Sequence, residues 1–291
     1  MPPLYDAHNH LQDDWLAPHR ARIEADLRAI GLRSAVANGT SEADWPAVAG
    51  LAARLPWVLP SYGLHPWDAG NRAEGWFDRL KARLAAEPDA AVGEIGLDRW
   101  ILDSAKPDDP RLAGLRRAPL EEQGEVFIKQ LSLAAAESRP ATIHCLQAFG
   151  ALEGLLRHVN TPARGFLLHA YGGPREMVAR FAEQGAYFSF NGAFLGERHA
   201  ARREAFRAVP ADRLLVETDA PAMPLPAPHA RFPLPPAPDG SPVNHPANLA
   251  AAYAGLAELR GVDPDNLTAQ VEQNFHRLFG KPAARAPESP D

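Results

Sequence analysis

Residues 4–10, Leu-Tyr-Asp-Ala-His-Asn-His, combine a short β-prone run with one aspartate and two histidines at alternate positions. Successive side chains of a strand point to opposite faces, so Asp6, His8 and His10 share one face. Two imidazole nitrogens on one face can bind the same divalent cation, and a carboxylate such as that of Asp6 can orient an imidazole ring. Two unrelated histidines at a strand end would give the same local pattern, so this stretch alone does not distinguish a cation site from chance.

The arrangement of a short apolar run followed by a helical pattern recurs along the chain. Eight β-prone runs each lead into a segment with apolar residues at helical spacing, which is typical of βα units and a parallel sheet. We therefore predict an α/β fold, a single-domain (β/α)8 TIM barrel. The expected strands are 4–8, 34–38, 57–63, 90–95, 141–145, 165–169, 186–190 and 214–218. The expected helices are 20–30, 42–55, 75–86, 121–137, 148–158, 175–183, 200–208, 247–260 and 267–278.

Two long irregular stretches and a tail interrupt this alternation. Residues 98–119 follow the fourth expected strand, and residues 220–246, which contain ten prolines, follow the eighth. Loops after strands form the catalytic face of a barrel, so both stretches are expected to cover the active site. We assign residues 1–280 to the barrel and expect residues 281–291 to form a disordered tail.

Composition limits the class of protein. The 291 residues are 46% hydrophobic and 23% charged, which is ordinary for a globular chain and excludes a disordered one. No apolar run approaches the roughly 18 residues of a membrane helix, so no membrane partner is expected. The lone cysteine, Cys145, excludes an internal disulfide and a thiolate cluster; we expect a cytoplasmic location and a buried structural thiol. The net charge of −6 argues against a broad basic face for nucleic acid.

Further ionisable residues close the later strands. His65, Glu94, His144 and His169 lie at the ends of the third to sixth expected strands, and Asp219 directly follows the eighth. A buried charge must be paired or bound to a metal, so these residues are costly there unless they function together. The carboxyl ends of barrel strands meet at one rim, where barrel enzymes hold their catalytic residues. The pattern therefore predicts one centre built from imidazoles and carboxylates.

Taken in order, these motifs resemble those of the TatD-like metal-dependent deoxyribonucleases, a branch of the amidohydrolase-like barrels. The resemblance spans nearly the whole chain and implies two divalent cations (zinc, manganese or magnesium), bridged by Glu94. The implied ligands are His8, His10, Glu94, His144, His169 and Asp219. The motifs that carry the resemblance are Asp6-Ala7-His8-Asn9-His10, Gly63-Leu64-His65-Pro66, Gly93-Glu94-Ile95-Gly96-Leu97-Asp98, the helix from Gln123 to Ala134, Ile143-His144, His169 with Gly172-Gly173, Glu217-Thr218-Asp219-Ala220-Pro221 and Asn274.

Two motifs depart from the pattern of the resembled family. Where that family commonly has an arginine two residues past the fifth-strand histidine, this chain has Leu146. Where it usually shows an arginine and then Asn-Glu-Pro before the penultimate helix, this chain reads Val243-Asn244-His245-Pro246. The first departure removes an expected phosphate contact, and the second removes both the arginine and the glutamate of the family pattern.

Roles for individual residues follow from the expected centre. Asp219 and Glu94 are the predicted catalytic residues, Asp219 as the general base and Glu94 as the bridge. His65 is expected either to be a core or supporting histidine or to donate a hydrogen bond to a substrate phosphate. In the mixed-charge stretch 98–119, Arg99 is predicted to contact substrate, together with Trp100 beside it, because both lie closest to the strand end.

The predicted activity is two-metal hydrolysis of a phosphodiester by a water that bridges the cations. The expected substrate is DNA, at single-stranded regions or ends, or a small phosphodiester. Hydrolysis of an ester or C–N bond is an alternative, including the aminoacyl-tRNA ester that some proteins similar to this family cleave. A metal-bound scaffold without catalysis is the third possibility, although a structural site would be closed to water.

Overall fold

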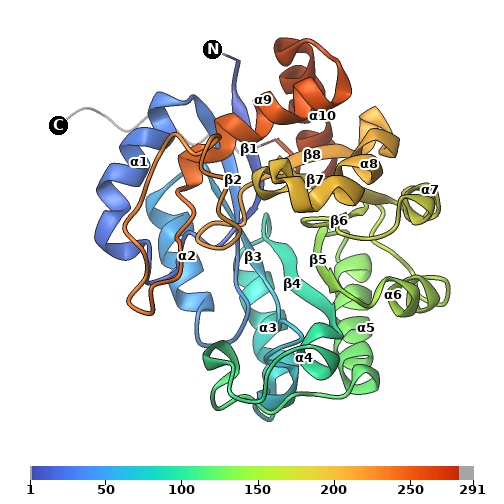
Figure 1. The fold of residues 1–291 in the computed structure, drawn as a ribbon. Coiled ribbons are helices and arrows are strands. Elements are labelled where there is room, and N and C mark those ends of the chain that lie inside the picture. Colours follow the sequence, from blue (N-terminus) through green and yellow to red (C-terminus); the bar gives the residue numbers. More distant parts are fainter. Residues whose placement is uncertain (1, 282–291) are drawn as a thin grey trace.

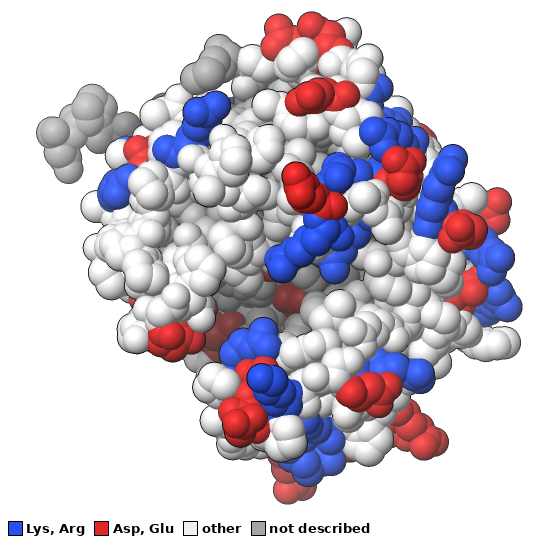
Figure 2. Space-filling view, in the orientation of Figure 1, with Lys and Arg blue, Asp and Glu red and all other residues white. Residues whose placement is uncertain are grey.

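The computed structural model describes residues 2–281, in which eight parallel strands form one sheet in the order β1 to β8, surrounded by helices (Figure 1). The fold is the predicted (β/α)8 barrel of the TIM type, with long connections after the fourth and eighth strands. Figure 2, in the same orientation, shows a hollow near the middle of this face with acidic side chains in its depth.

The strands are β1 (Leu4–Asn9), β2 (Leu32–Asn38), β3 (Val58–Tyr62), β4 (Ala91–Asp98), β5 (Ala141–Leu146), β6 (Phe166–Leu168), β7 (Ala186–Asn191) and β8 (Leu214–Glu217). The helices are α1 (Arg20–Ala29), α2 (Trp45–Arg54), α3 (Trp76–Ala86), α4 (Trp100–Asp103), α5 (Leu120–Ala136), α6 (Phe149–Leu156), α7 (Val178–Glu183), α8 (Ala200–Ala208), α9 (Leu249–Arg260) and α10 (Pro264–Phe279). Short 3-10 turns include η5 (Gly192–Leu195), η6 (Glu197–His199) and η8 (Pro246–Asn248).

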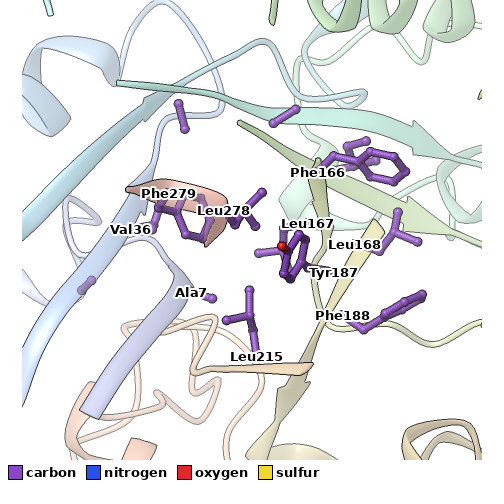
Figure 3. Packing of buried hydrophobic residues seen from close by; sticks show 14 of the residues in the cluster. Ala7, Val36, Phe166, Leu167, Leu168, Tyr187, Phe188, Leu215, Leu278 and Phe279 are labelled. Atoms are coloured by element: carbon purple, nitrogen blue, oxygen red, sulfur yellow. The ribbon is translucent and has the colours of Figure 1, made fainter. Parts of the chain in front are cut away.

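Alternation along the strands separates the inside of the barrel from the layer beneath the helices. Leu167 of β6 and Tyr187 of β7 are register partners and point to one side, whereas Phe166 and Phe188 point to the other (Figure 3). All four side chains are buried. Because the side-chain period is two, the side that holds Leu167 continues to His169 at the end of β6. Burial of these apolar residues therefore fixes where His169 points.

The seam between β8 and β1 closes at the carboxyl end of the barrel. The backbone N–H of Asp219 donates to the carbonyl of His8 (2.9 Å). The carboxylate of Asp6 accepts from the backbone N–H (3.0 Å) and the hydroxyl (2.6 Å) of Thr218. The prediction that Asp6 orients an imidazole is therefore wrong, because its oxygens are taken by Thr218 and by the backbone N–H of His8. Asp6 joins two strands instead.

The expected strands and helices are present, with boundaries that differ by a few residues. The stretch 98–119 is less irregular than predicted, since it begins with the last residue of β4 and contains α4. Residues 220–245 contain neither helix nor strand. In Figure 1 this loop passes in front of α1, and His245 Nε2 lies 3.2 Å from Asp26 Oδ2 of that helix.

Three further expectations concern the tail, the membrane and the cysteine. Residues 282–291 lie outside the described residues, so the disordered tail stays a prediction. Among the described helices, none combines the length and the apolar character needed to cross a bilayer. Cys145 is half-buried rather than fully buried, packs against the hydrophobic core, and has a pKa raised by burial.

Two glycines allow β4 to approach β5. A Cβ at Gly93 would lie 1.8 Å from Oγ1 of Thr142, and one at Gly96 would lie 1.9 Å from the carbonyl oxygen of His144. Gly96 also has a φ of +151°, which L side chains rarely adopt. These close approaches place Glu94, between the two glycines, against the end of β5.

Replacing Gly96 by alanine is expected to lower the free energy of unfolding by about 1–3 kcal/mol or more, because the methyl group would collide with backbone that cannot yield. Urea denaturation measures the change. Gly150→Ala in α6 is the control, since a Cβ there has no heavy atom within 4 Å apart from its chain neighbours and the backbone of its own helix, and it should be neutral or slightly stabilising. Wild-type stability in Gly96→Ala would contradict the close approach of β4 to β5.

Candidate metal centre

The carboxylate of Glu94 in β4 lies at the middle of a cluster of histidines and is almost fully buried. Its Oε2 lies 3.4 Å from His8 Nε2 and 3.3 Å from His10 Nε2. Its Oε1 lies 3.1 Å from His144 Nδ1 and 2.9 Å from His169 Nε2. The two oxygens of one carboxylate thus face two different pairs of imidazoles, which is the arrangement that a bridging ligand needs.

The first group contains His8, His10 and Asp219. The Nε2 atoms of His8 and His10 are 3.3 Å apart, and Asp219 Oδ1 lies 3.7 Å and 3.4 Å from them. His10 Nδ1 donates to the carbonyl of Asn38 (2.9 Å), which leaves the lone pair of the neutral ring on Nε2. Imidazole nitrogens that face each other beside carboxylate oxygens form a donor set suited to a divalent cation.

The second group contains His144, His169 and, on its edge, His65. His144 Nδ1 and His169 Nε2 are 3.2 Å apart. His65 Nε2 lies 3.4 Å from Glu94 Oε1, about as close as the expected ligands. Its Nδ1 accepts the backbone N–H of Trp67 (3.2 Å), so the neutral ring carries its proton on Nε2. This tautomer suits donation of a hydrogen bond better than coordination of a metal.

Two buried carboxylates that the sequence argument left out of the site support the histidines of the second group. Asp98 Oδ2 lies 3.2 Å from His144 Nε2, and Glu217 Oε1 lies 3.7 Å from His169 Nδ1. Such outer carboxylates fix the tautomer and raise the basicity of a ligating imidazole. Asp98 could have been found from its spacing, because it lies four residues past Glu94 and so on the same face of β4.

The charges of the cluster depend on one another. Burial would raise the pKa of Glu94, but the neighbouring histidines, His169 foremost, hold it well below its usual range. Burial likewise opposes ionisation of Asp219, whose pKa is nevertheless lowered by its hydrogen bond with His10. Burial lowers the pKa of His144, but Asp98 and Glu94 outweigh it and raise this pKa to about 9. Both carboxylates of the centre are therefore anionic at neutral pH.

The residues present fit more than one divalent cation. Within the described chain, three sets of side chains each bring their ligand atoms within 4.8 Å of one another: His8 with Glu94 and His169, His8 with His10 and Asp219, and His65 with Glu94 and His144. Every residue of the implied ligand set belongs to at least one of these groups.

Comparison with known proteins identifies the family to which this chain belongs. The family model described as TatD related DNase matches residues 5–280. The chain belongs to the TatD related DNase family. The "3'-5' ssDNA/RNA exonuclease TatD" of Citrobacter koseri is 30% identical over 279 residues, covering 95% of this chain and 99% of the relative. The protein of the same name from Escherichia fergusonii is also 30% identical over 279 residues.

Solved structures of TatD-related proteins share the fold. The Escherichia coli TatD homologue YJJV superposes with a TM-score of 0.81 at 26% identity, covering 96% of this chain and 98% of its own. A TatD-family hydrolase from Entamoeba histolytica gives a TM-score of 0.79 at 16% identity and supports the fold alone. The family match and the shared fold both extend over the whole barrel. The chain is thus a hydrolase of the TatD family.

The two departures from the TatD pattern lie in different surroundings. Leu146 ends β5 and is half-buried, and its carbonyl accepts the backbone N–H of Arg99 (2.9 Å). His245 is fully buried beside α1, and burial is the first cause of a pKa lowered to about 4. His245 is therefore neutral and held against α1, where it contributes no positive charge to a phosphate.

A cavity of about 610 Å³ opens over the cluster. The loops after β1, β2 and β3 line one wall with Asp13, Asp14, Asp44 and Asp68, and no Lys or Arg is among the described lining residues. Of the two stretches expected to cover the site, only Ala222 lines the cavity. Arg99 is exposed, with its Nε 4.0 Å from Asp103, and its contact with substrate stays a prediction.

Glu94→Ala is expected to abolish retention of both cations, because each group of imidazoles loses the oxygen that it faces in the shared carboxylate. His65→Ala should retain them, since the proton on Nε2 makes His65 a donor. Elemental analysis of the dialysed proteins measures the difference, with Asp14→Ala as the control that alters the cavity wall alone. If His65→Ala lost as much metal as Glu94→Ala, His65 would be a metal ligand, and the second group of ligands would have to include it.

Proposed function

We propose that this protein hydrolyses phosphodiester bonds with two divalent cations and acts on single-stranded DNA or RNA, or on nucleic acid ends. The observation that carries the proposal is that the two oxygens of the Glu94 carboxylate face two different pairs of histidines. Oε2 faces His8 and His10, and Oε1 faces His144 and His169. The name "3'-5' ssDNA/RNA exonuclease TatD", given to relatives 30% identical, supports the substrate class. A cytoplasmic location belongs to the same proposal.

Cations held by His8, His10, Glu94, His144, His169 and Asp219 would supply Lewis acidity toward a phosphoryl oxygen and toward the attacking water. The five histidines of the cluster favour zinc or manganese over magnesium, because imidazole suits the softer ions. In this proposal the Asp219 carboxylate accepts the proton of the attacking water. His65, whose Nδ1 accepts from Trp67, would donate its Nε2 proton to a substrate oxygen at the edge of the second group.

The cavity also offers an aromatic surface beside the second group. The Trp67 indole lines the cavity and donates to Asp98 Oδ2 (2.6 Å), the same oxygen that faces His144. Trp100 stacks on it with ring centroids 6.0 Å apart, and both side chains are half-buried. Nucleobases stack on such rings in single-strand-binding proteins, with little dependence on base identity. An aromatic pair next to the candidate centre supports a nucleotide substrate.

The acidic wall favours a second candidate. Asp13, Asp14, Asp44 and Asp68 would repel a polyanion at the cavity, and burial with the nearby Asp44 raises the pKa of Asp68 to about 6. A substrate with an ester or C–N bond and little negative charge would avoid this repulsion. Turnover of bis(4-nitrophenyl) phosphate, a single-stranded oligonucleotide, an aminoacyl ester and a cyclic amide by metal-reconstituted protein distinguishes the two. Hydrolysis of the last two substrates alone would overturn the phosphodiesterase proposal.

Asp219→Asn is expected to keep the fold but to lower turnover of a phosphodiester by roughly a hundredfold or more, the scale for loss of a general base. Asparagine keeps the volume and one oxygen but cannot accept the proton of the attacking water. Turnover is compared at matched metal occupancy, with Asp14→Asn as the control because Asp14 lines the cavity and belongs to none of the three groups of candidate ligands. A near-wild-type rate in Asp219→Asn would transfer the role of base to another group.

A further inference from the structure

Arg202 in α8 has no acceptor for its charge within the described chain. Its guanidinium packs on the Phe194 ring, 4.9 Å from the centroid, and is half-buried. No described carboxylate lies within 4.0 Å of it, and no hydrogen bond from it is found. Burial and the nearby Arg198 lower the pKa of Arg202. A guanidinium has five N–H donors, so leaving all of them unpaired in a half-buried position is costly.

The surroundings of Arg202 add positive charge. Arg198 donates to His199 Nε2 (3.1 Å), and no described carboxylate pairs with it either. The guanidinium of Arg203 donates hydrogen bonds to the carbonyls of Phe194 and Gly196 (2.7 and 2.6 Å). The first turn of α8 contains no acidic residue, although a helix N-terminus disfavours cations. Positive charge therefore accumulates around Arg202. Arg207 on the same helix differs, because it is paired with Glu204.

The guanidinium of Arg202 lies beside the loop that follows the ligand strand β6. A Cβ at Gly172 would lie 3.3 Å from Arg202 Nε, so the guanidinium rests against the open side of this glycine. Gly172 follows His169 by three residues, which span at most about 10 Å. The backbone N–H of Gly172 has no acceptor in the described chain. Figure 2 shows basic side chains along the upper edge of the hollow, where Figure 1 places the segment between β7 and α8.

We propose that Arg202 and Arg198, with the backbone N–H of Gly172, form a phosphate-binding site on the rim, which holds the sugar–phosphate backbone of a single-stranded nucleic acid one or more nucleotides from the reacting phosphate. An arginine fork binds phosphate oxygens with charge-assisted hydrogen bonds, and a glycine leaves room for the backbone to approach. The inference rests on the proposed function, since it supplies the cationic contact that the acidic cavity wall lacks.

Binding of a fluorescein-labelled phosphorothioate oligothymidylate to the metal-loaded protein tests the site by fluorescence anisotropy. The phosphorothioate resists hydrolysis, so the measurement needs no turnover. Arg202→Ala and Arg198→Ala are each expected to raise Kd about tenfold at low salt. The slope of log Kd against log salt should become shallower by about one for each arginine removed. Arg202→Lys should restore part of the affinity, because it keeps the charge but loses the fork.

Arg207→Ala is the matched control, because it removes one exposed, paired arginine from the same helix and should change Kd by less than about twofold. Equal weakening by Arg207→Ala and Arg202→Ala would mean a general charge effect and overturn the site. Failure of the wild-type protein to bind the oligothymidylate would overturn it too. Arginine-dependent binding in a protein that hydrolyses no phosphodiester would support the rim site and overturn the proposed function alone.

Discussion

The buried carboxylate of Glu94 is the constraint on which the centre depends. An ionised carboxylate cannot remain in an apolar barrel without positive or hydrogen-bonding partners, and Glu94 obtains them from five histidines that lie in or just after four of the strands. Parallel strands make this possible because their carboxyl ends all face the same rim. The glycines on each side of Glu94 let β4 lie close enough to β5 for His144 to take part. Packing, burial and charge are therefore satisfied by one arrangement.

Closure of the barrel and placement of the first group of ligands use the same hydrogen bonds. Asp6 ties the backbone and hydroxyl of Thr218 to β1, and the next residue, Asp219, donates its N–H to the carbonyl of His8. Asp219 sits at a φ of +53°, in the left-handed region that aspartate tolerates better than most residues. Any change that opened the seam would therefore also separate Asp219 from His8 and His10.

The sequence predicted the parts of this site that depend on periodicity, and missed those that depend on tertiary contacts. Alternation along strands was enough to bring His8, His10, Glu94, His144, His169 and Asp219 toward one rim. It could not say that Asp6 would meet Thr218, since their pairing joins residues 212 positions apart. The helix α4 was hidden in a loop of mixed charge, because a single turn carries too little periodicity to detect. Spacing could have placed Asp98 near the centre, but the supporting roles of Asp98 and Glu217 required knowing which imidazole nitrogen faces each carboxylate.

The distribution of charge on this face has a physical reason that links the centre to the rim. Glu94 and Asp219 must attract divalent cations, and an arginine close to them would compete for the same carboxylates and weaken that attraction. The Asp residues on the cavity wall act in the opposite sense, since negative charge near the histidines favours bound cations while disfavouring an approaching polyanion. Arginines that bind a nucleic acid backbone must therefore lie at some distance from Glu94 and Asp219, so that they attract the backbone without weakening the binding of the cations. Arg198 and Arg202 meet this demand in the proposed rim site, since neither lines the cavity over Glu94 and Arg202 lies against Gly172 in the loop after β6.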